Sequence, residues 1–474
     1  MIRYLHRNLI IEEADVPADL SLLDYLRDNR GIKASKEGCA SGDCGACTVA
    51  LGYVNADSKL EYRSVNACIC PASELQGADL ITAGDLETAE GLHPLQQAFV
   101  TEHASQCGFC TPGFIVSGFT LLEHVNSPSL DQIRQAVAGN LCRCTGYGPI
   151  IKAIANTAPS YTSSIAKQQV LESLMSLKHS ARHEQANETQ AFMLPETLQQ
   201  LGACMRSHPN AELIAGGTDL MLEITQQLKN KSSMISLSRI HALQKIETTD
   251  HQVVMGAGVS FNQMLHWANH YMPSLAHLLI HIGSDQIRNR GTLGGNLGTA
   301  SPIGDLAPVL LALDARIHLW HPEGSRSMPL DSYFLGYRKT ALKVGEIIHS
   351  LEFKLPQVSD LWVIDKVSKR VEDDISAICM ALWARSNEGV IVDFRLGLGG
   401  VAATPIRATD IENGIIGQTL GSIKHADLET LVKASITPLD DLRATAAYRI
   451  HCTSALLFEG LKQLGPSKET SNEY

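Results

Sequence analysis

Two cysteines, Cys142 and Cys144, flank a single arginine in the stretch GNLCRCTGYGP at residues 139–149. A disulfide between such near neighbours would be strained, so two thiols aimed at one point indicate metal binding instead. A second close pair, Cys107 and Cys110, lies upstream in QCGFC. This combination of C-x2-C and C-x-C is compatible with a zinc site and with an iron–sulfur cluster, and spacing alone does not choose between them.

A denser cysteine group lies earlier, in GCASGDCGAC at residues 38–47. Cys39, Cys44 and Cys47 have the C-x4-C-x2-C spacing of plant-type [2Fe–2S] sites, and the intervening glycines allow the tight turns that such a loop needs. A zinc loop is the alternative, although zinc usually uses paired short spacings. A fourth ligand is expected downstream, where NACICP offers both Cys68, 21 residues after Cys47, and Cys70.

Helices are expected to position the two later cysteine pairs. Thr111-Pro112 predicts the N-cap and first residue of a helix through FIVSGFTLLEHV, and Ser129 with Gln132 predicts a capping box that opens LDQIRQAVAGNL. One pair directly precedes the first of these helices, whose positive dipole end favours thiolates, and the other pair ends the second. The pattern predicts four thiolates at one point, and the plant-type group upstream favours a second redox centre there.

The residues before about position 82 read as short strands and one helix. Leu22, Leu23 and Leu26 have helical spacing in LSLLDYLRDN (20–29), which GIK ends at Gly31. TVALGYV and KLEYRSV read as strands on either side of a turn. Residues 160–190 are polar and have the composition of a linker that could hold a helix, and the region from about 360 to 470 reads as α+β.

Composition limits the classes of protein that fit. The chain has 474 residues, enough for about three domains, with 44% hydrophobic and 19% charged residues and a formal net charge of −11. Without a basic block, neither nucleic acid nor an anionic membrane is expected as a partner. No apolar run is long enough for a membrane helix and no signal peptide is recognisable, so we expect a cytoplasmic protein. In that setting the nine of twelve cysteines that precede residue 145 indicate metal rather than disulfides.

Two glycine-rich stretches could bind phosphate. AGGTDL (215–220) lies between a short apolar run and a predicted helix, and its backbone N–H groups could cradle a diphosphate. RGTLGGNLGTASPIGD (290–305) offers a second loop with Thr292, Asn296, Thr299 and Asp305 as polar contacts. A glycine turn without a ligand is the alternative for each. GAGVSF (256–261) lacks the third glycine of the dinucleotide fingerprint, since Phe261 stands there, and is interpreted as a structural turn.

Taken together, these motifs make a recognisable set. KEGCASGDCGACTV, QCGFCTPGF, GNLCRCTGYGPI, AGGTDL and QIRNRGTLGGNLGTASPIGDLAP closely resemble the iron–sulfur/flavin subunits of bacterial xanthine dehydrogenases, in the molybdenum hydroxylase family. The resemblance covers nearly the whole chain in the same motif order. It implies an α+β multidomain fold with five segments: a β-grasp ferredoxin-like domain (1–82), a four-helix [2Fe–2S] domain (83–160), a linker (161–190), a two-lobed flavin domain of the vanillyl-alcohol-oxidase-like (PCMH) type (191–360), and an α+β C-terminal domain like that of the CO dehydrogenase flavoprotein (361–474).

The resemblance also implies the ligands of each cofactor. One [2Fe–2S] cluster would be held by Cys39, Cys44, Cys47 and Cys68, because the NAC motif matches the family's fourth ligand, and a second by Cys107, Cys110, Cys142 and Cys144. The implied FAD contacts are Leu213, Ile214, Ala215, Gly216, Gly217, Thr218, Asp219, Leu220, Thr292, Leu293, Gly294, Gly295, Asn296, Thr299, Asp305, Ile348 and Lys366. Some relatives carry an aromatic residue beside the flavin where this chain has Ile282.

The implied function is electron transfer. A separate large subunit with molybdopterin would oxidise the purine, and this chain would pass the electrons through two clusters to FAD and then to NAD, with no catalytic residue for the purine in this chain. A heterotetramer of two small and two large chains is the implied assembly. The alternatives are the same role for an aldehyde, nicotinate or related substrate, and, from another class, a zinc-stabilised binding protein without redox activity.

The first prediction concerns the metal at Cys142. We expect Cys142→Ser to lower the iron content from about four to about two atoms per chain, because a [2Fe–2S] cluster needs four cysteine ligands. FAD, which the later loops would hold, should stay bound. Iron and flavin analysis of the purified variant makes the test, and retention of all the iron would contradict the assignment.

Overall fold

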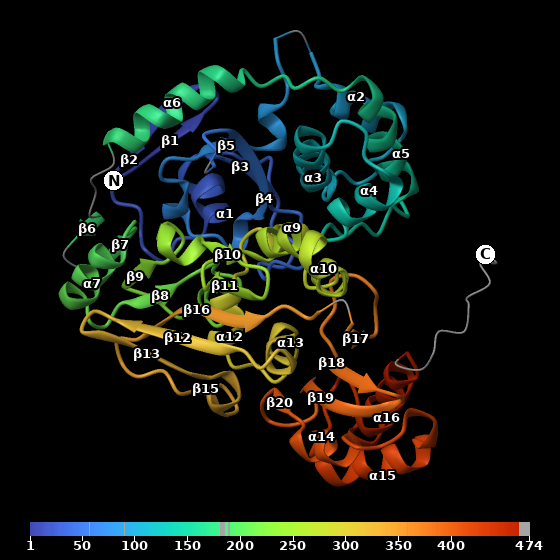
Figure 1. Ribbon diagram of the computed structural model, residues 1–474. Coiled ribbons are helices and arrows are strands. Elements are labelled where there is room, and N and C mark those ends of the chain that lie inside the picture. The colour runs from blue at the N-terminus through green and yellow to red at the C-terminus, as the bar shows by residue number, and fades with distance from the viewer. Residues whose placement is uncertain (56, 90, 181–184, 188–189, 358, 464–474) are drawn as a thin grey trace. The chain divides into compact units, whose positions relative to one another are not determined.

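The computed structural model describes residues 1–463 except 56, 90, 181–184, 188–189 and 358. The chain divides into two compact units, whose helices and strands are labelled in Figure 1. The first contains residues 1–239 and a short arm, 283–291, and the second contains residues 240–282 and everything from Thr292 onward. Of the region predicted to bind flavin, residues 191–239 and 283–291 belong to the first unit, and residues 240–282 and 292–360 belong to the second.

A five-stranded sheet begins the first unit. Its strand order is β2-β1-β5-β3-β4, with β1 and β5 parallel and the other pairs antiparallel. The strands are β1 (Ile2–His6), β2 (Leu9–Glu13), β3 (Thr48–Val54), β4 (Leu60–Asn66) and β5 (Asp79–Ile81). The predicted helix is a turn of α-helix, α1 (Leu22–Asp24), that continues as a π-helical turn over Tyr25–Asn29. Leu22, Leu23 and Leu26 are buried beneath the sheet, which gives the predicted β-grasp arrangement.

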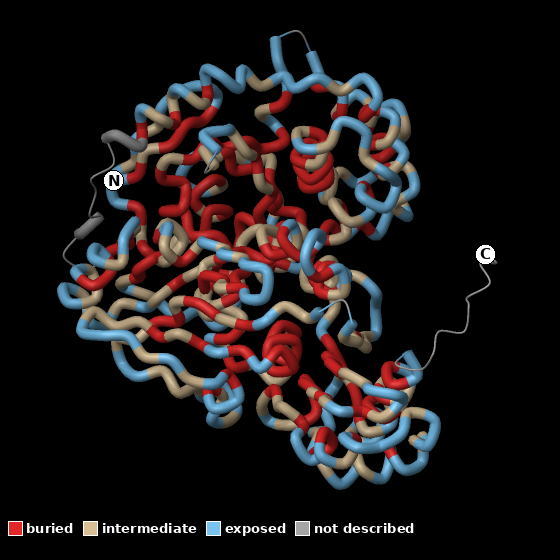
Figure 2. Tube along the Cα trace, viewed as in Figure 1, coloured by how far each residue is buried: buried red, intermediate tan, exposed pale blue. Residues whose placement is uncertain are grey.

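Four helices follow, as predicted. They are α2 (Pro94–Thr101), α3 (Thr111–His124), α4 (Leu130–Val137) and α5 (Gly148–Thr157). The capping box of Ser129 and Gln132 opens α4 as expected, whereas the N-cap of α3 is Cys110 and not Thr111, so the helix begins one residue earlier than predicted. Figure 2 shows α3 largely in the colour of buried residues, because Phe114, Val116 and Phe119 face a shared apolar core.

The segment predicted as a linker contains helix α6 (Lys167–Ser180). Val170, Leu174 and Leu177 of this helix are buried against Leu5 of β1. The other residues of the helix are mostly polar, which is why the composition of this segment resembles that of a linker. This part of the chain therefore packs on the first sheet where the structure describes it.

The first unit ends in a smaller sheet and the arm. The sheet has the order β6-β7-β9-β8 and the helices α7 and α8 beside it. The arm contributes the short helix α11 to the same unit. The bounds are β6 (Gln185–Asn187), β7 (Gln190–Met193), β8 (Glu212–Ile214), β9 (Ser233–Ser236), α7 (Leu198–Ser207), α8 (Leu220–Thr225) and α11 (Asp285–Arg288).

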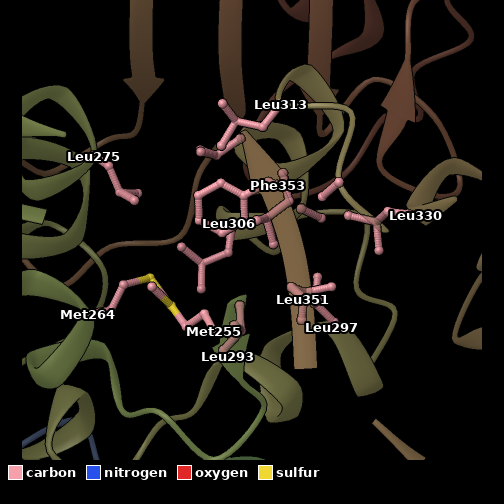
Figure 3. Packing of buried hydrophobic residues seen from close by; sticks show 14 of the residues in the cluster. Met255, Met264, Leu275, Leu293, Leu297, Leu306, Leu313, Leu330, Leu351 and Phe353 are labelled. Carbon is pink, nitrogen blue, oxygen red and sulfur yellow. The ribbon is translucent and has the colours of Figure 1, made fainter. Parts of the chain in front are cut away.

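The second unit contains two larger sheets and a two-stranded one, β14-β15. One of the larger sheets has the order β10-β11-β16-β12-β13 and the other β17-β18-β19-β20. Strands of both and helix α13 share one core, in which Met255, Leu306 and Phe353 converge (Figure 3). The strands are β10 (Ile246–Thr248), β11 (Gln252–Gly256), β12 (Arg316–His321), β13 (Gly324–Pro329), β14 (Phe334–Gly336), β15 (Lys339–Thr340), β16 (Ile347–Lys354), β17 (Leu361–Val367), β18 (Ile378–Asn387), β19 (Val390–Gly399) and β20 (Ile406–Arg407). The helices are α9 (Phe261–Tyr271), α10 (Pro273–Ile280), α12 (Leu293–Gly298), α13 (Leu306–Ala312), α14 (Thr409–Ile415), α15 (His425–Ser435) and α16 (Ala446–Lys462).

No helix in the described part of the chain is both long and apolar enough to cross a membrane.

Candidate cluster and flavin sites

The β3–β4 hairpin brings the first thiol set together. Its register pairs Thr48 with Asn66, so the residues just outside the hairpin, Cys47 and Cys68, meet at its open end. The thiol of Cys47 interacts with that of Cys68, and the thiol of Cys39 interacts with those of both Cys44 and Cys68. All four predicted cysteines therefore lie in one group.

Cys70, the other candidate for the fourth position, points elsewhere. Its thiol is fully buried and lies 3.7 Å from the carbonyl oxygen of Pro71, to which it donates. Burial raises the pKa of the Cys70 thiol to about 11, as expected for a group that stays protonated. The structure thus separates two cysteines that spacing could not tell apart.

Backbone donors surround the sulfur of Cys39. The N–H groups of Ser41 and Cys44 both donate to this sulfur at 3.4 Å. Hydrogen bonds from the thiols of Cys44 and Cys68 lower the pKa of Cys39 well below its usual range. The close approach of the Cys44 sulfur requires glycine at position 38, since a Cβ on Gly38 would lie 2.7 Å from that sulfur. The loop is thus built to stabilise negative charge on sulfur.

The second thiol set meets where α3 begins. The sulfurs of Cys107 and Cys144 lie 3.7 Å apart, and the thiol of Cys110 interacts with that of Cys142. Thr145 donates to the Cys142 sulfur through its N–H at 3.5 Å, and its hydroxyl lies 3.1 Å from the same sulfur. Burial and Cys142 together raise the pKa of Cys110 to about 12. The helix pair predicted from sequence therefore does bring four thiols to one place.

The arrangement of both sets fits a two-iron cluster. Two thiolates on one tetrahedral ion at about 2.3 Å are about 3.7 Å apart, and Cys107 and Cys144 have that separation. A thiolate pair of this width suits either tetrahedral zinc or tetrahedral iron. Two sets of four thiols fit two [2Fe–2S] clusters, with two thiolates on each iron.

A polar bridge that the sequence did not reveal joins the two cysteine loops. The N–H of Leu141, next to Cys142, donates to the carbonyl of Cys44 at 3.0 Å, and the amide nitrogen of Asn140 donates to the carbonyl of Gly45 at 3.0 Å. Gly45 has φ +65°, and a Cβ there would lie 2.3 Å from the carbonyl oxygen of Gly139. The two loops thus touch through their backbones.

Gln286 on the arm completes this bridge. Its side-chain nitrogen is within 3.1–3.2 Å of oxygens of Thr48, Ser117 and Asn140, and the residue is completely buried. Because Ser117 also donates to Asn140 at 2.7 Å, the bridge involves the sheet, helix α3 and the arm. Asn140 stands beside the cysteine motif in GNLCRC, which is the one sequence signal for it; Gln286 has no such signal.

The first half of the predicted flavin site lies in the first unit. The loop of residues 215–219 joins β8 to α8, as the sequence predicted, with Leu213 and Ile214 on the strand and Leu220 at the start of the helix. At Gly216 a Cβ would lie 1.9 Å from the carbonyl oxygen of Arg290. Gly217 has φ +82°, and a Cβ there would lie 3.2 Å from the carbonyl oxygen of Ile69. Both glycines are required for the loop to approach its neighbours so closely.

The other predicted flavin residues lie in the second unit. Thr292 caps α12 by accepting the N–H of Gly295 at 3.0 Å, and Ile348 of β16 lies beside Gly298 of the same helix. The side-chain oxygen of Asn296 is buried with no hydrogen-bond partner of its own, as expected for an atom that faces a ligand. Leu293, Gly294, Gly295 and Thr299 lie in or directly after α12.

Asp305 and Lys366 form a separate buried pair in that unit. Lys366 lies 3.0 Å from the carboxylate of Asp305, which also accepts a hydrogen bond from Ser376 at 2.5 Å. Lys366 donates to the carbonyl of His281 as well.

The GAGVSF turn supports α12, since the carbonyl of Ala257 accepts the N–H of Gly294 at 2.7 Å, which agrees with the structural interpretation of that motif.

Comparison with known proteins identifies the domains of the chain. Four family models match the chain: a 2Fe-2S iron-sulfur cluster binding domain at residues 8–73, a [2Fe-2S] binding domain at 82–155, the FAD binding domain in molybdopterin dehydrogenase at 186–357, and the CO dehydrogenase flavoprotein C-terminal domain at 365–464. These matches show that the chain contains two [2Fe–2S] domains, an FAD-binding domain of the molybdopterin dehydrogenase type and a C-terminal domain of the CO dehydrogenase flavoprotein type.

Among curated relatives, the chain is 30% identical to the xanthine dehydrogenase/oxidase of Gallus gallus, over 84% of this chain and 35% of that protein. It is also 30% identical to the xanthine dehydrogenase of Emericella nidulans, over 88% of this chain and 35% of that protein. The chain therefore spans about a third of the length of these relatives.

Solved structures agree on the fold. The chain resembles the carbon monoxide dehydrogenase of Hydrogenophaga pseudoflava with a TM-score of 0.52 and 25% identity, over 57% of this chain and 94% of that one. It resembles the CO dehydrogenase of Oligotropha carboxidovorans with a TM-score of 0.53 and 24% identity, over 58% and 96% of the two chains. These likenesses show the fold that the chain shares with the two dehydrogenases.

The bridge between the cysteine loops predicts the effect of Asn140→Ala. Its loss removes the hydrogen bonds of Asn140 with Gly45, Ser117 and Gln286, each worth about 0.5–1.5 kcal/mol, while Thr48 still pairs with Gly45 and Gln286. We expect the thermal midpoint at which the visible cluster absorbance disappears to fall by about 2–10 °C. The control is Asn156→Ala, which loses only an exposed hydrogen bond to Glu102 and should shift the midpoint very little. Equal midpoints for both variants would contradict the bridging role.

The close contact at Gly216 predicts a loss of flavin. Gly216→Ala forces a methyl group onto the carbonyl of Arg290 and so displaces the loop, which should lower the FAD content of the purified protein at least several-fold. Gly421→Ala is the matched control, because a Cβ at Gly421 meets nothing within 4 Å. Full FAD occupancy in Gly216→Ala would show that the loop does not hold the cofactor.

Proposed function

We propose that this chain is the electron-transfer component of an NAD-dependent xanthine dehydrogenase. Cys39, Cys44, Cys47 and Cys68 would hold one [2Fe–2S] cluster, Cys107, Cys110, Cys142 and Cys144 the other, and the loops at residues 213–220 and 292–299, with Asp305, Ile348 and Lys366, would hold FAD. The clusters would carry single electrons, and the flavin would combine two of them for hydride transfer to NAD. The observation that carries the proposal is the convergence of eight cysteines into two groups of four within one compact unit.

The chain's own residues have defined tasks in this scheme. Backbone N–H groups and the Thr145 hydroxyl stabilise negative charge on the cysteine sulfurs. Asn140 and Leu141 hold the two cysteine loops together. The fixed loops keep any cofactors that they bind from moving apart, which rapid electron exchange requires.

A large molybdopterin-containing partner would dock near the second thiol set. Cys107 and Cys144 are exposed, and Phe109 and Leu141 beside them are 47% and 49% exposed. Exposed apolar side chains around a redox site are suited to a protein partner. The other cysteine set is more enclosed, with Cys47 and Cys68 only 2% exposed. A complex of two small and two large chains is the proposed assembly.

Xanthine is proposed as the substrate because the curated relatives described above are named xanthine dehydrogenases. The same electron-transfer role in an enzyme for an aldehyde, nicotinate or a related heterocycle is the second candidate. It is favoured by likeness in fold to a quinoline 2-oxidoreductase from Pseudomonas putida, with a TM-score of 0.52. The partner's active site, and not this chain, would decide between them.

Isolation of the complex tests this function. Affinity purification of the chain from its own organism should recover a larger chain that contains molybdenum, and xanthine should reduce NAD in the presence of the complex. The Cys142→Ser complex should retain the partner but lose NAD reduction, because one electron carrier is missing. Oxidation of an aldehyde or nicotinate with no activity on xanthine would favour the second candidate, and a complex without molybdenum would contradict both.

A further inference from the structure

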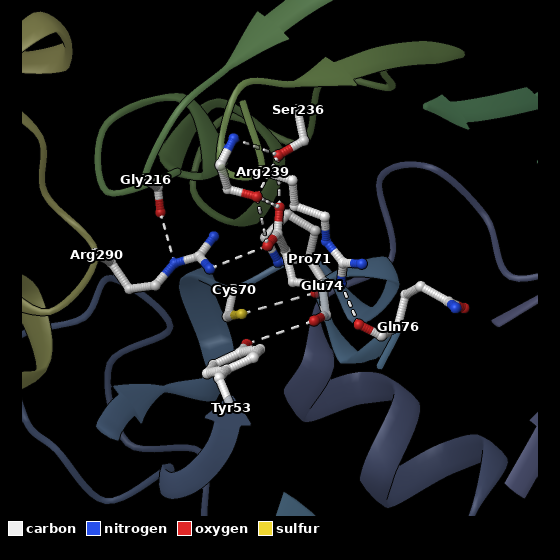
Figure 4. A network of polar contacts seen from close by, with 10 residues as sticks. Tyr53, Cys70, Pro71, Glu74, Gln76, Gly216, Ser236, Arg239 and Arg290 are labelled. Carbon is white, nitrogen blue, oxygen red and sulfur yellow. Dashed lines mark hydrogen bonds and ion pairs between the residues drawn. The ribbon is translucent and has the colours of Figure 1, made fainter. Parts of the chain in front are cut away.

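A buried carboxylate lies where the flavin loop meets the first cluster domain (Figure 4). Glu74 follows β4 and is only 3% exposed. It accepts hydrogen bonds from the hydroxyl of Ser236 at 2.7 Å and from that of Ser238 at 3.1 Å. Burial would raise the pKa of Glu74, but Arg290 and Arg239 outweigh this effect and hold it below its ordinary value. Glu74 is therefore a buried, charged group that contacts Ser236, Ser238 and Arg290, with the charge of Arg239 close by.

Arg290 connects this carboxylate to the flavin loop. One end of its guanidinium lies 3.2 Å from the Glu74 carboxylate, and its Nε donates to the carbonyl of Gly216 at 3.0 Å. The backbone of Arg290 also packs on Gly216, where no Cβ would fit. Arg290 thus holds Gly216 at two points, while its charge is neutralised by a residue of the cluster domain.

Two further contacts reinforce the same junction. Gly217 packs against the carbonyl of Ile69, the residue after Cys68. Arg239, at the end of the lobe, donates to the carbonyl of Gln76. The loop that would hold the flavin phosphates is therefore fixed to the stretch that follows a cluster ligand, and Glu74 and Arg290 supply the only ion pair among these contacts.

We propose that Glu74 and Arg290 are positioning residues that fix the loop 215–219 against the segment after Cys68, and so set the separation of the bound flavin from the first cluster. This inference rests on the proposed function, since it requires both cofactors. Neither residue would touch a reacting atom. An ion pair suits this task because breaking one partner leaves a buried charge uncompensated, so the junction resists opening.

The variant Arg290→Lys tests whether the geometry of the Arg290 side chain matters apart from its positive charge. Lysine keeps a positive charge for Glu74 but has no Nε–H that could donate to Gly216 at the same time. We expect FAD to bind roughly tenfold more weakly, as a hydrogen bond to a charged group is lost. In the holoenzyme with flavin remaining, the magnetic coupling between the flavin radical and the reduced first cluster, measured by electron paramagnetic resonance, should decrease.

Glu74→Asp is the second variant, and it keeps the charge but shortens the side chain by one methylene. It should show the same loss of magnetic coupling. If Arg290→Lys does not fold, Glu74→Asp alone tests the positioning role of the ion pair. The control is Lys229→Met, which removes an exposed ion pair to Glu223 in the same lobe and should leave both readouts unchanged.

The outcomes separate the two proposals. A wild-type holoenzyme without iron or flavin would overturn the proposed function itself. A wild-type holoenzyme with both cofactors, and variants with unchanged FAD affinity and unchanged coupling, would overturn only the positioning role of Glu74 and Arg290. Weaker FAD binding and reduced coupling in either variant, absent from the control, would support it.

Discussion

Four thiolates at one point repel one another, and they converge only where the backbone forces them together. Both cysteine sets of this chain depend on that constraint. The β3–β4 hairpin closes the first set, because its register leaves Cys47 and Cys68 side by side. The start of α3 and the loop after α4 close the second. The hydrogen bond from Leu141 to the carbonyl of Cys44 then ties the loops to each other, so that each set helps to hold the other.

The same logic extends to the flavin loop. Gly216 and Gly217 allow backbone to pack on backbone, and the buried pair of Glu74 and Arg290 holds that packing in place. Interiors are close-packed, so a contact of this kind tolerates little displacement. In the proposed function the chain would pass electrons between fixed carriers, and rigid junctions suit that task better than mobile ones. The arm at residues 283–291 serves both junctions, through Gln286 at one and Arg290 at the other.

Much of the fold could be predicted from local sequence signals. The hairpin strands, the capping box at Ser129 and the glycine loop before α8 each depend on residues close together in the chain, and the structure contains them. The N-cap of α3 was misplaced by one residue, because Cys110 takes the position that Thr111 was expected to hold. The choice of Cys68 over Cys70 needed the resemblance, since both follow the same strand. Asn140, Gln286, Glu74 and Arg290 could not be found from sequence, because their partners lie far away along the chain and only tertiary packing brings them together.

The central claim is that the two cysteine sets hold iron–sulfur clusters beside a flavin. Metal, sulfide and flavin analysis of the purified wild-type protein tests it most directly. The account predicts a brown-red protein with about four iron atoms and about four acid-labile sulfides per chain, and with FAD released on denaturation. A colourless protein that contains zinc and no labile sulfide would contradict it.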